Sequence, residues 1–195
     1  MTGKHELGEP MTETPIRRLP VNLDELAYAL HNSDQIGMAH YLDLETGEIV
    51  MITDEMRAEA EQISEAIEAD TENYSAAFEE ALAESDRPDW MKDGIRLVDA
   101  VEAGYGTRFI TVPSVDSHET YEDMADFITT VTNRHVREHL AEAIAGKRPF
   151  RRFKDALYDY PQERERWFAF SAERERQRAL AWLESIGVTP VEGKS

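Results

Sequence analysis

The sequence predicts an α+β protein that is predominantly helical, in which about six helices pack on one face of a small antiparallel sheet. Two observations predict the sheet: a β-hairpin signature over residues 41–52 and a short apolar segment over residues 108–112. The helices are predicted by apolar residues that recur with helical spacing through most of the remaining chain. No internal repeat at a fixed period interrupts this pattern.

The first helix is predicted to begin after Asn22. Asparagine is a favoured N-cap residue, and Glu25 three residues later gives the pattern of a capping box. Val21 and Leu26 occupy the two positions of a hydrophobic staple, which fixes how the chain enters the helix. We expect this helix to end near residues 31–33.

The hairpin is predicted from two apolar segments that flank a turn. Residues 41–44 lead into Glu45–Glu48, and residues 49–52 follow as the second strand. Gly47 supplies the positive φ that a type I turn closing with a bulge requires. Because residues 49–52 are all apolar, we expect covered faces on both sides of this strand.

An acidic helical region follows over residues 54–85, with a narrow apolar stripe that is interrupted at residues 70–73. Pro88 is suited to open the next helix, which we expect to extend from Trp90 to about Ala103. Gly104–Gly106 then turn the chain into the strand at residues 108–112.

Helical signals continue to the end of the chain. Asp116 and Glu119 give a second capping box, and Asn133 is suited to cap the helix after it. Gly146 is expected at the C′ position of that helix, where a left-handed residue is common. Pro149 opens one more helix, Pro161 marks a break, and a long last helix follows that ends at Gly187. Two helices therefore follow Gly146. Three residues are expected to bury one side of the first of these two helices: Phe150, Phe153 and Leu157.

The 195 residues are predicted to form one globular domain over residues 20–188. Residues 1–19 and 189–195 are polar and are expected to be disordered. No run of about 18 apolar residues predicts a membrane span, and residues 1–10 lack the apolar core of a secretory signal. The chain has no cysteine, which excludes disulfides and thiolate zinc sites and is typical of a cytoplasmic protein.

The net charge of −19 is distributed unevenly. Residues 54–86 hold 12 acidic side chains and one basic one, whereas residues 134–178 hold 12 basic and 8 acidic side chains. The acidic region is interpreted as a solvated helix surface that repels nucleic acid at long range. The alternative interpretation is that the basic region forms a local site for an anion.

Three pairs of sequence blocks together resemble a known family: Val21–Glu25 with Tyr41–Ile49, Ile110–Glu119 with Asp126–Ile128, and Phe150–Leu157 with Trp167–Phe170. The family comprises small, acidic bacterial proteins and is uncharacterised. The resemblance extends over residues 20–188 and implies a bacterial, cytoplasmic, single-domain protein. It supplies no activity, substrate or catalytic residue.

The strongest candidate site is a basic segment of five cations: Lys147, Arg148, Arg151, Arg152 and Lys154. Arginine side chains offer a bidentate fork to phosphate or carboxylate, so the segment is a candidate anion site. The alternative is structural, with these cations holding acidic helices or capping a helix end. The spacing of the neighbouring aromatic residues favours burial over base stacking, so nucleic acid is not the expected partner.

Three further motifs are weaker. His135 and His139 with Glu138 match a short zinc-peptidase pattern, but no third ligand follows, so no metal site is predicted. His118 and Tyr121 are candidates for a pocket between sheet and helices. The carboxylates of the hairpin are expected to be exposed turn residues: Asp43, Glu45 and Glu48.

The function class follows mainly from what is absent. The chain has no P-loop, dinucleotide-binding glycine motif or nucleophile elbow, so no catalytic residue and no cofactor is predicted. We expect a non-enzymatic binding or regulatory protein whose partner is another protein or a second copy. Two alternatives stay open: a small enzyme or ligand-binding domain with an anion-recognising pocket, and a nucleic-acid-related regulator or DNA mimic.

Overall fold

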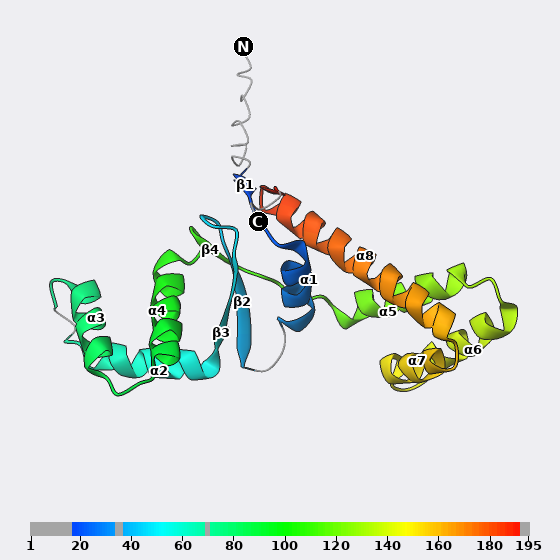
Figure 1. The fold of residues 1–195 in the computed structure, drawn as a ribbon, viewed down its shortest axis with the longest axis horizontal. Helices are drawn as coiled ribbons and strands as arrows, with labels where there is room; N and C mark the ends of the chain where they lie inside the picture. Colours follow the sequence, from blue (N-terminus) through cyan, green and yellow to red (C-terminus); the bar gives the residue numbers. More distant parts are fainter. Residues whose placement is uncertain (1–16, 34–36, 69–70, 192–195) are drawn as a thin grey trace, which may run out of the picture.

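The computed structural model describes residues 17–33, 37–68 and 71–191, which form eight helices and five strands (Figure 1). The strands are β1 (Arg17–Leu19), β2 (Met38–Asp43), β3 (Ile49–Thr53), β4 (Phe109–Thr111) and β5 (Val188–Pro190). The first four helices are α1 (Leu23–Asn32), α2 (Asp54–Glu65), α3 (Tyr74–Glu84) and α4 (Asp89–Gly104). The other four are α5 (Ser117–Thr130), α6 (Arg134–Ile144), α7 (Pro149–Tyr158) and α8 (Pro161–Ser185). The predicted α+β, mostly helical class is confirmed.

The main sheet is antiparallel, in the order β3-β2-β4. The predicted hairpin is present, with Gly47 at a φ of 82° in its turn. The strand predicted at residues 108–112 joins the hairpin, because β4 pairs with β2 and places Ile110 opposite Leu42.

Helices cover both faces of this sheet, as expected for the strand at residues 49–52, so the expectation that the helices pack on one face is wrong. Successive strand residues point to opposite faces. Leu42 joins an apolar cluster with α1 and the end of α8, whereas Tyr41 and Ile52 join a cluster with α2, α3 and α4. The sheet is therefore the partition between two cores.

A second, parallel pair of strands joins the two ends of the described chain. β1 pairs with β5, with Leu19 opposite Pro190. Leu19 and Val188 are buried in the same cluster as α1. Ordered structure thus extends a few residues beyond the predicted domain limits at both ends; residues 1–16 and 192–195 lie outside the described residues.

The molecule is elongated, with one arm built from α2–α4 and another from α5–α7 (Figure 1). A third apolar cluster lies in the second arm and includes Phe127, Leu140 and Phe153. Helix α8 links this cluster to the centre of the molecule. Trp167 and Phe170 near its start pack on the third cluster, and Ala179 and Leu183 near its end lie in the α1 cluster.

The predicted N-cap residues are found at three helix starts, but the capping box predicted at α5 is not completed. Asn22 and Asn133 accept hydrogen bonds from backbone amides in the first turns of α1 and α6. Asp116 caps α5 as predicted, but Glu119 accepts a hydrogen bond from Arg178 at 2.9 Å instead of completing a capping box.

The turn between α6 and α7 also differs from the prediction. The left-handed residue is Arg148, with φ of 58° and ψ of 54°, and Gly146 does not take positive φ. A Cβ atom on Gly146 would collide with the guanidinium of Arg152. The guanidinium is the far end of a flexible side chain that could move aside, so neither this contact nor a positive φ requires glycine at this position.

Candidate functional site

The best candidate site is a groove of about 490 Å³ where the second arm meets the centre of the molecule. Helices α5, α7 and α8 form its walls, and the end of α1 and the chain before α5 close one side. Ligand pockets commonly have volumes of about 300–1,000 Å³. We call this concavity the aromatic groove, after the wall residues Phe150, Phe153, Trp167 and Phe168.

The aromatic wall has a buried base and an exposed rim. Phe153 is buried and packs edge-on against Trp167, with ring centroids 4.9 Å apart. Phe150, one helical turn earlier on α7, was expected in the core but is 38% exposed. Phe168 is 61% exposed on α8. Two aromatic rings therefore face solvent at the mouth of the groove.

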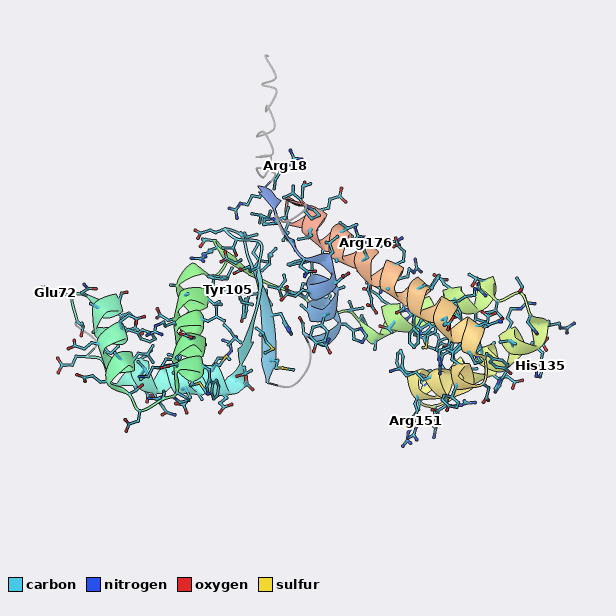
Figure 2. All side chains as sticks on the ribbon, in the orientation of Figure 1. Arg18, Glu72, Tyr105, His135, Arg151 and Arg176 are labelled. Atoms are coloured by element: carbon cyan, nitrogen blue, oxygen red, sulfur yellow. The ribbon has the colours of Figure 1, made fainter. Side chains whose placement is uncertain are left out.

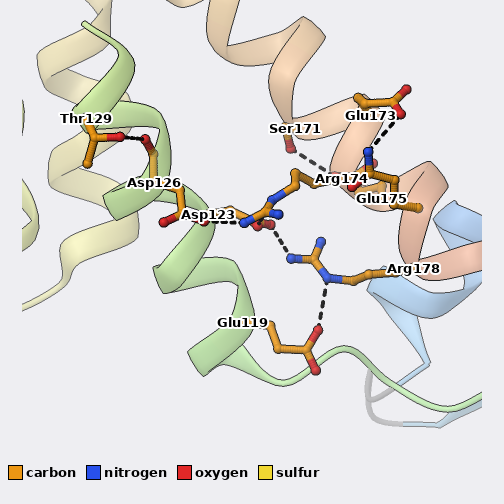
Figure 3. Close-up of polar contacts among 10 residues, drawn as sticks. Glu119, Asp123, Asp126, Thr129, Ser171, Glu173, Arg174, Glu175 and Arg178 are labelled. Atoms are coloured by element: carbon orange, nitrogen blue, oxygen red, sulfur yellow. Dashed lines mark hydrogen bonds and ion pairs between the residues drawn. The ribbon is translucent and has the colours of Figure 1, made fainter. Parts of the chain in front are cut away.

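An ion-pair network centred on the buried Asp123 joins α5 to α8 beside the groove (Figure 3). Asp123 is only 4% exposed and accepts a hydrogen bond from Arg174 Nε at 2.9 Å and another from Arg178. Arg178 also donates to Glu119, and Arg174 also pairs with Asp126. Both oxygens of Asp123 are thus engaged, which is the arrangement of a structural carboxylate and not of a free general base.

Arg178 keeps its positive charge in this network. Burial lowers the pKa of Arg178, but its hydrogen bonds and charge interactions with Asp123 and Glu119 outweigh burial and raise the pKa above the ordinary value. The guanidinium therefore stays positively charged throughout the range in which proteins fold. It neutralises the carboxylates on α5 and holds this wall of the groove in place.

Three charged or titratable side chains line the groove without an ion pair among the described residues: Lys154, Glu175 and His31. Glu175 accepts a hydrogen bond from Ser171 Oγ at 3.1 Å, which leaves acceptor capacity on its carboxylate. Lys154 and His31 are exposed. The groove thus offers an apolar wall with separate donor and acceptor groups at its edge.

The five cations of the basic segment do not converge on one point. Lys154 lines the aromatic groove, whereas Arg152 lies against Gly146 and lines a shallow depression with His139 and Glu142. Arg151 is 3.8 Å from Asp155, and its side chain is exposed. Arg148 forms the turn before α7, and Lys147 is exposed beside it. A single five-cation anion site is therefore not formed within one chain.

The other sequence candidates are also separated from the groove. His118 is exposed, with Nε2 3.6 Å from Glu122, although its neighbours Ser117 and Thr120 do line the groove. Tyr121 packs against the apolar cluster of the second arm. His139 shares a hydrogen-bond contact of 3.0 Å with Tyr160. In the described part of the chain, no three His, Cys, Asp or Glu side chains are placed to hold a metal ion.

All the hairpin carboxylates were expected to be exposed, but one of them is buried. Asp43 is only 3% exposed and accepts hydrogen bonds from Arg108, the shortest at 2.7 Å. Glu45 lies 3.2 Å from the same guanidinium, and Glu48 is exposed. Asp43 therefore fastens the chain before β4 to the hairpin, and it also accepts a hydrogen bond from the Glu45 amide within the turn.

Sequence reasoning missed the residues that define the groove. Phe168 was not singled out, because spacing alone does not separate a rim residue of a long helix from a core residue. The alternating Glu-Arg pairs of that helix signalled ion pairing but not the partner on α5. Of the residues predicted to carry function, only Lys154 lines the groove.

Comparison with known proteins places the chain in a family. A model of an uncharacterised protein family, UPF0158, matches residues 96–195. A UPF0158 protein of Pseudomonas aeruginosa is 27% identical over 180 residues, which cover 92% of each chain. UPF0158 proteins of Chlamydia trachomatis and Chlamydia muridarum are each 28% identical over 79 residues, covering 40% of this chain and 24% of theirs.

No solved structure matches this one significantly. None of the helices in the described part of the chain is long and apolar enough to cross a membrane. The family match agrees with the resemblance read from the sequence and covers all of α5–α8, which build the walls of the groove. The chain belongs to the uncharacterised protein family UPF0158.

Proposed function

We propose that this chain is a non-enzymatic binding protein of the bacterial cytoplasm that holds a partner protein through the aromatic groove. The occupant is an aromatic or long aliphatic side chain of the partner, flanked by carboxylates. The observation that carries the proposal is the exposure of Phe150 and Phe168 on the rim of the groove, at 38% and 61%.

Exposed aromatic rings beside a concave surface are typical of protein interfaces. Binding energy concentrates in a few anchors that fill well-packed pockets, and aromatic residues are enriched among them. Phe153 and Trp167 already form a fixed, packed base, so an incoming side chain meets a preformed surface. A partner that covers both rims removes apolar area from water, which stabilises the complex by about 25 cal/mol per Å² before the costs of association.

The charges at the groove select the chemistry of the partner. Lys154 at the groove and Arg151 three residues before it on α7 carry exposed positive groups. They favour carboxylates next to the anchor, because complementary charges at a rim steer association. The carboxylate of Glu175 provides an acceptor for an N–H group that enters with the anchor.

A small ligand is a second candidate for the same groove. The volume of about 490 Å³ suits a drug-sized molecule, and Lys154 would bind a carboxylate or phosphate on it. The scattered cations of the basic segment give less support to a nucleic-acid partner, because no continuous basic track accompanies them.

The test compares capture of partners by two variants. Phe168→Ser removes a rim ring, and Tyr158→Ser removes an exposed aromatic ring on α7 outside the groove-lining set. We expect tagged wild-type protein and Tyr158→Ser to recover the same stoichiometric protein from an extract of the source bacterium. Phe168→Ser is expected to bind that purified protein about 30-fold more weakly, because the loss of a hot-spot residue typically weakens binding by this factor.

Two outcomes would count against the proposal. If Phe168→Ser and wild type bind the recovered protein with equal affinity, the groove is not part of the interface with that protein. Native mass spectrometry of freshly purified protein tests the second candidate: a small bound molecule present in wild type and absent in Phe168→Ser would make the groove a ligand site instead.

A further inference from the structure

We infer that the aromatic groove takes Trp90 of a second copy of this chain, so that the molecules associate head to tail. This inference rests on the proposed function, because it names an occupant for the same groove. It follows from the exposure of Trp90, from the charges around it and from its position on the opposite arm.

Trp90 is a large apolar side chain with no cover. Trp90 lies in the first turn of α4, two residues after Pro88, and its side chain is 61% exposed. Asp86 and Asp89 beside it are both exposed and have no ion pair among the described residues. The first turn of α4 therefore presents the chemistry that the groove selects: an aromatic anchor flanked by carboxylates.

The two surfaces are chemically complementary. An indole ring buries about 150–250 Å² and usually finds an acceptor for its N–H when it leaves water. Glu175 supplies such an acceptor in the groove. Lys154 and Arg151 supply positive charges for the aspartates that accompany Trp90.

The two surfaces cannot meet within one molecule. Helix α4 belongs to one arm and the groove to the other, and Figure 2 shows Glu72 and Arg151 on opposite arms of the molecule. The two arms also differ in net charge. Residues 38–104 carry 19 acidic and 4 basic side chains, whereas residues 117–185 carry 13 acidic and 12 basic side chains. The contact is therefore between different surfaces of two copies, which is a heterologous interface.

A heterologous contact makes a distinctive prediction for mixed variants. Trp90→Ser retains the groove, and Phe168→Ser retains the tryptophan. In sedimentation velocity we expect the wild type to form species larger than a monomer as concentration rises. Each variant alone is expected to stay monomeric, and an equimolar mixture is expected to form a 1:1 dimer that grows no further, because only one productive contact remains. Tyr105→Ser, an exposed ring elsewhere on the α4 arm, serves as the control that assembles normally.

Three results would overturn the inference: a wild type that stays monomeric at every accessible concentration, a Trp90→Ser variant that assembles like wild type, or a mixture of the two variants that forms no dimer. These results are separable from failure of the proposed function. If Phe168→Ser no longer binds the captured partner while the wild type stays monomeric, the groove binds a different protein. The proposed function then stands, and only the inference that the chain binds a second copy of itself fails.

Discussion

At the scale of single residues, the buried carboxylates of this protein are structural. Asp43 and Asp123 are 3% and 4% exposed, and arginine side chains occupy their oxygens. A buried carboxylate without such partners would cost several kcal/mol of desolvation. Each therefore fixes two elements to one another: Asp43 holds the chain before β4 to the hairpin, and Asp123 holds α8 to α5.

Asp43 gives the fold a specific dependence on acid pH. Burial raises its pKa, but the hydrogen bond and charge of Arg108 and the backbone amides of Glu45 and Thr46 outweigh burial, so the pKa lies below the ordinary value of 3.8. The folded protein then binds this proton more weakly than the unfolded chain does. The pair therefore stabilises the fold fully above the ordinary pKa, and this stabilisation is lost as pH falls through the lowered pKa.

Urea denaturation of wild type and Asp43→Asn from pH 7 to pH 3 measures the effect. The difference in the free energy of unfolding is expected to be constant above about pH 5 and to shrink as the solution becomes more acid. Asp126→Asn, which removes a carboxylate that is 58% exposed, should show a small difference at neutral pH. A gap between wild type and Asp43→Asn that does not narrow in acid would contradict this account.

At the scale of elements, the turn between α6 and α7 is held in a conformation that its residue disfavours. Arg148 has φ of 58°, where a residue with a Cβ atom costs about 1–2 kcal/mol relative to the right-handed region. Glycine removes that cost but loses about 0.4–1 kcal/mol through the greater freedom of the unfolded chain. Arg148→Gly is therefore expected to leave the free energy of unfolding unchanged or to raise it by up to about 1 kcal/mol.

The matched control is Arg151→Gly, three residues later in the interior of α7, where glycine costs about 1 kcal/mol. Thermal and urea denaturation of both variants check the difference in sign. A loss of stability in Arg148→Gly as large as that in Arg151→Gly would show that the arginine side chain makes contacts that outweigh its backbone strain.

Elements were predictable where their signals are local. The cap at Asn22, the turn at Gly47 and the proline start of α7 depend on neighbours in sequence, and all are found in the structure. The partners of Asp43 and Asp123 lie 65 and 51 residues away, and no local pattern specifies such a pairing. Residues 41 and 42 are both apolar, which in retrospect signals a strand covered on both faces.

The groove was less predictable than the elements that form it. Apolar residues in a helical pattern are interpreted as core, so Phe150 was assigned to the interior and Phe168 was not singled out. Only the packed arrangement of α5, α7 and α8 shows that these two rings are left at a rim. Lys154 was recognised because charge density is visible in sequence, but its role as a groove residue depends on the same packing.

At the scale of the whole molecule, α8 connects clusters that would otherwise be separate. Its 25 residues span about 37 Å, which is long enough to pack on the second arm at one end and beside α1 at the other. The Asp123 network reinforces this connection between the two clusters. We therefore expect the second arm and the α1 cluster to unfold together, because neither can lose its contacts with α8 independently.

A proline in the middle of α8 tests this coupling. Ala172 is exposed between Phe170 and Arg174, so its replacement removes no core contact. Ala172→Pro breaks the helix at a cost of about 3 kcal/mol or more, and we expect calorimetry to resolve two unfolding transitions where wild type shows one for these clusters. Ala172→Gly weakens the same position by about 1 kcal/mol without interrupting the helix and should keep the single transition at lower temperature. A single, uniformly lowered transition in Ala172→Pro would mean that contacts other than the continuous helix hold the arm to the centre.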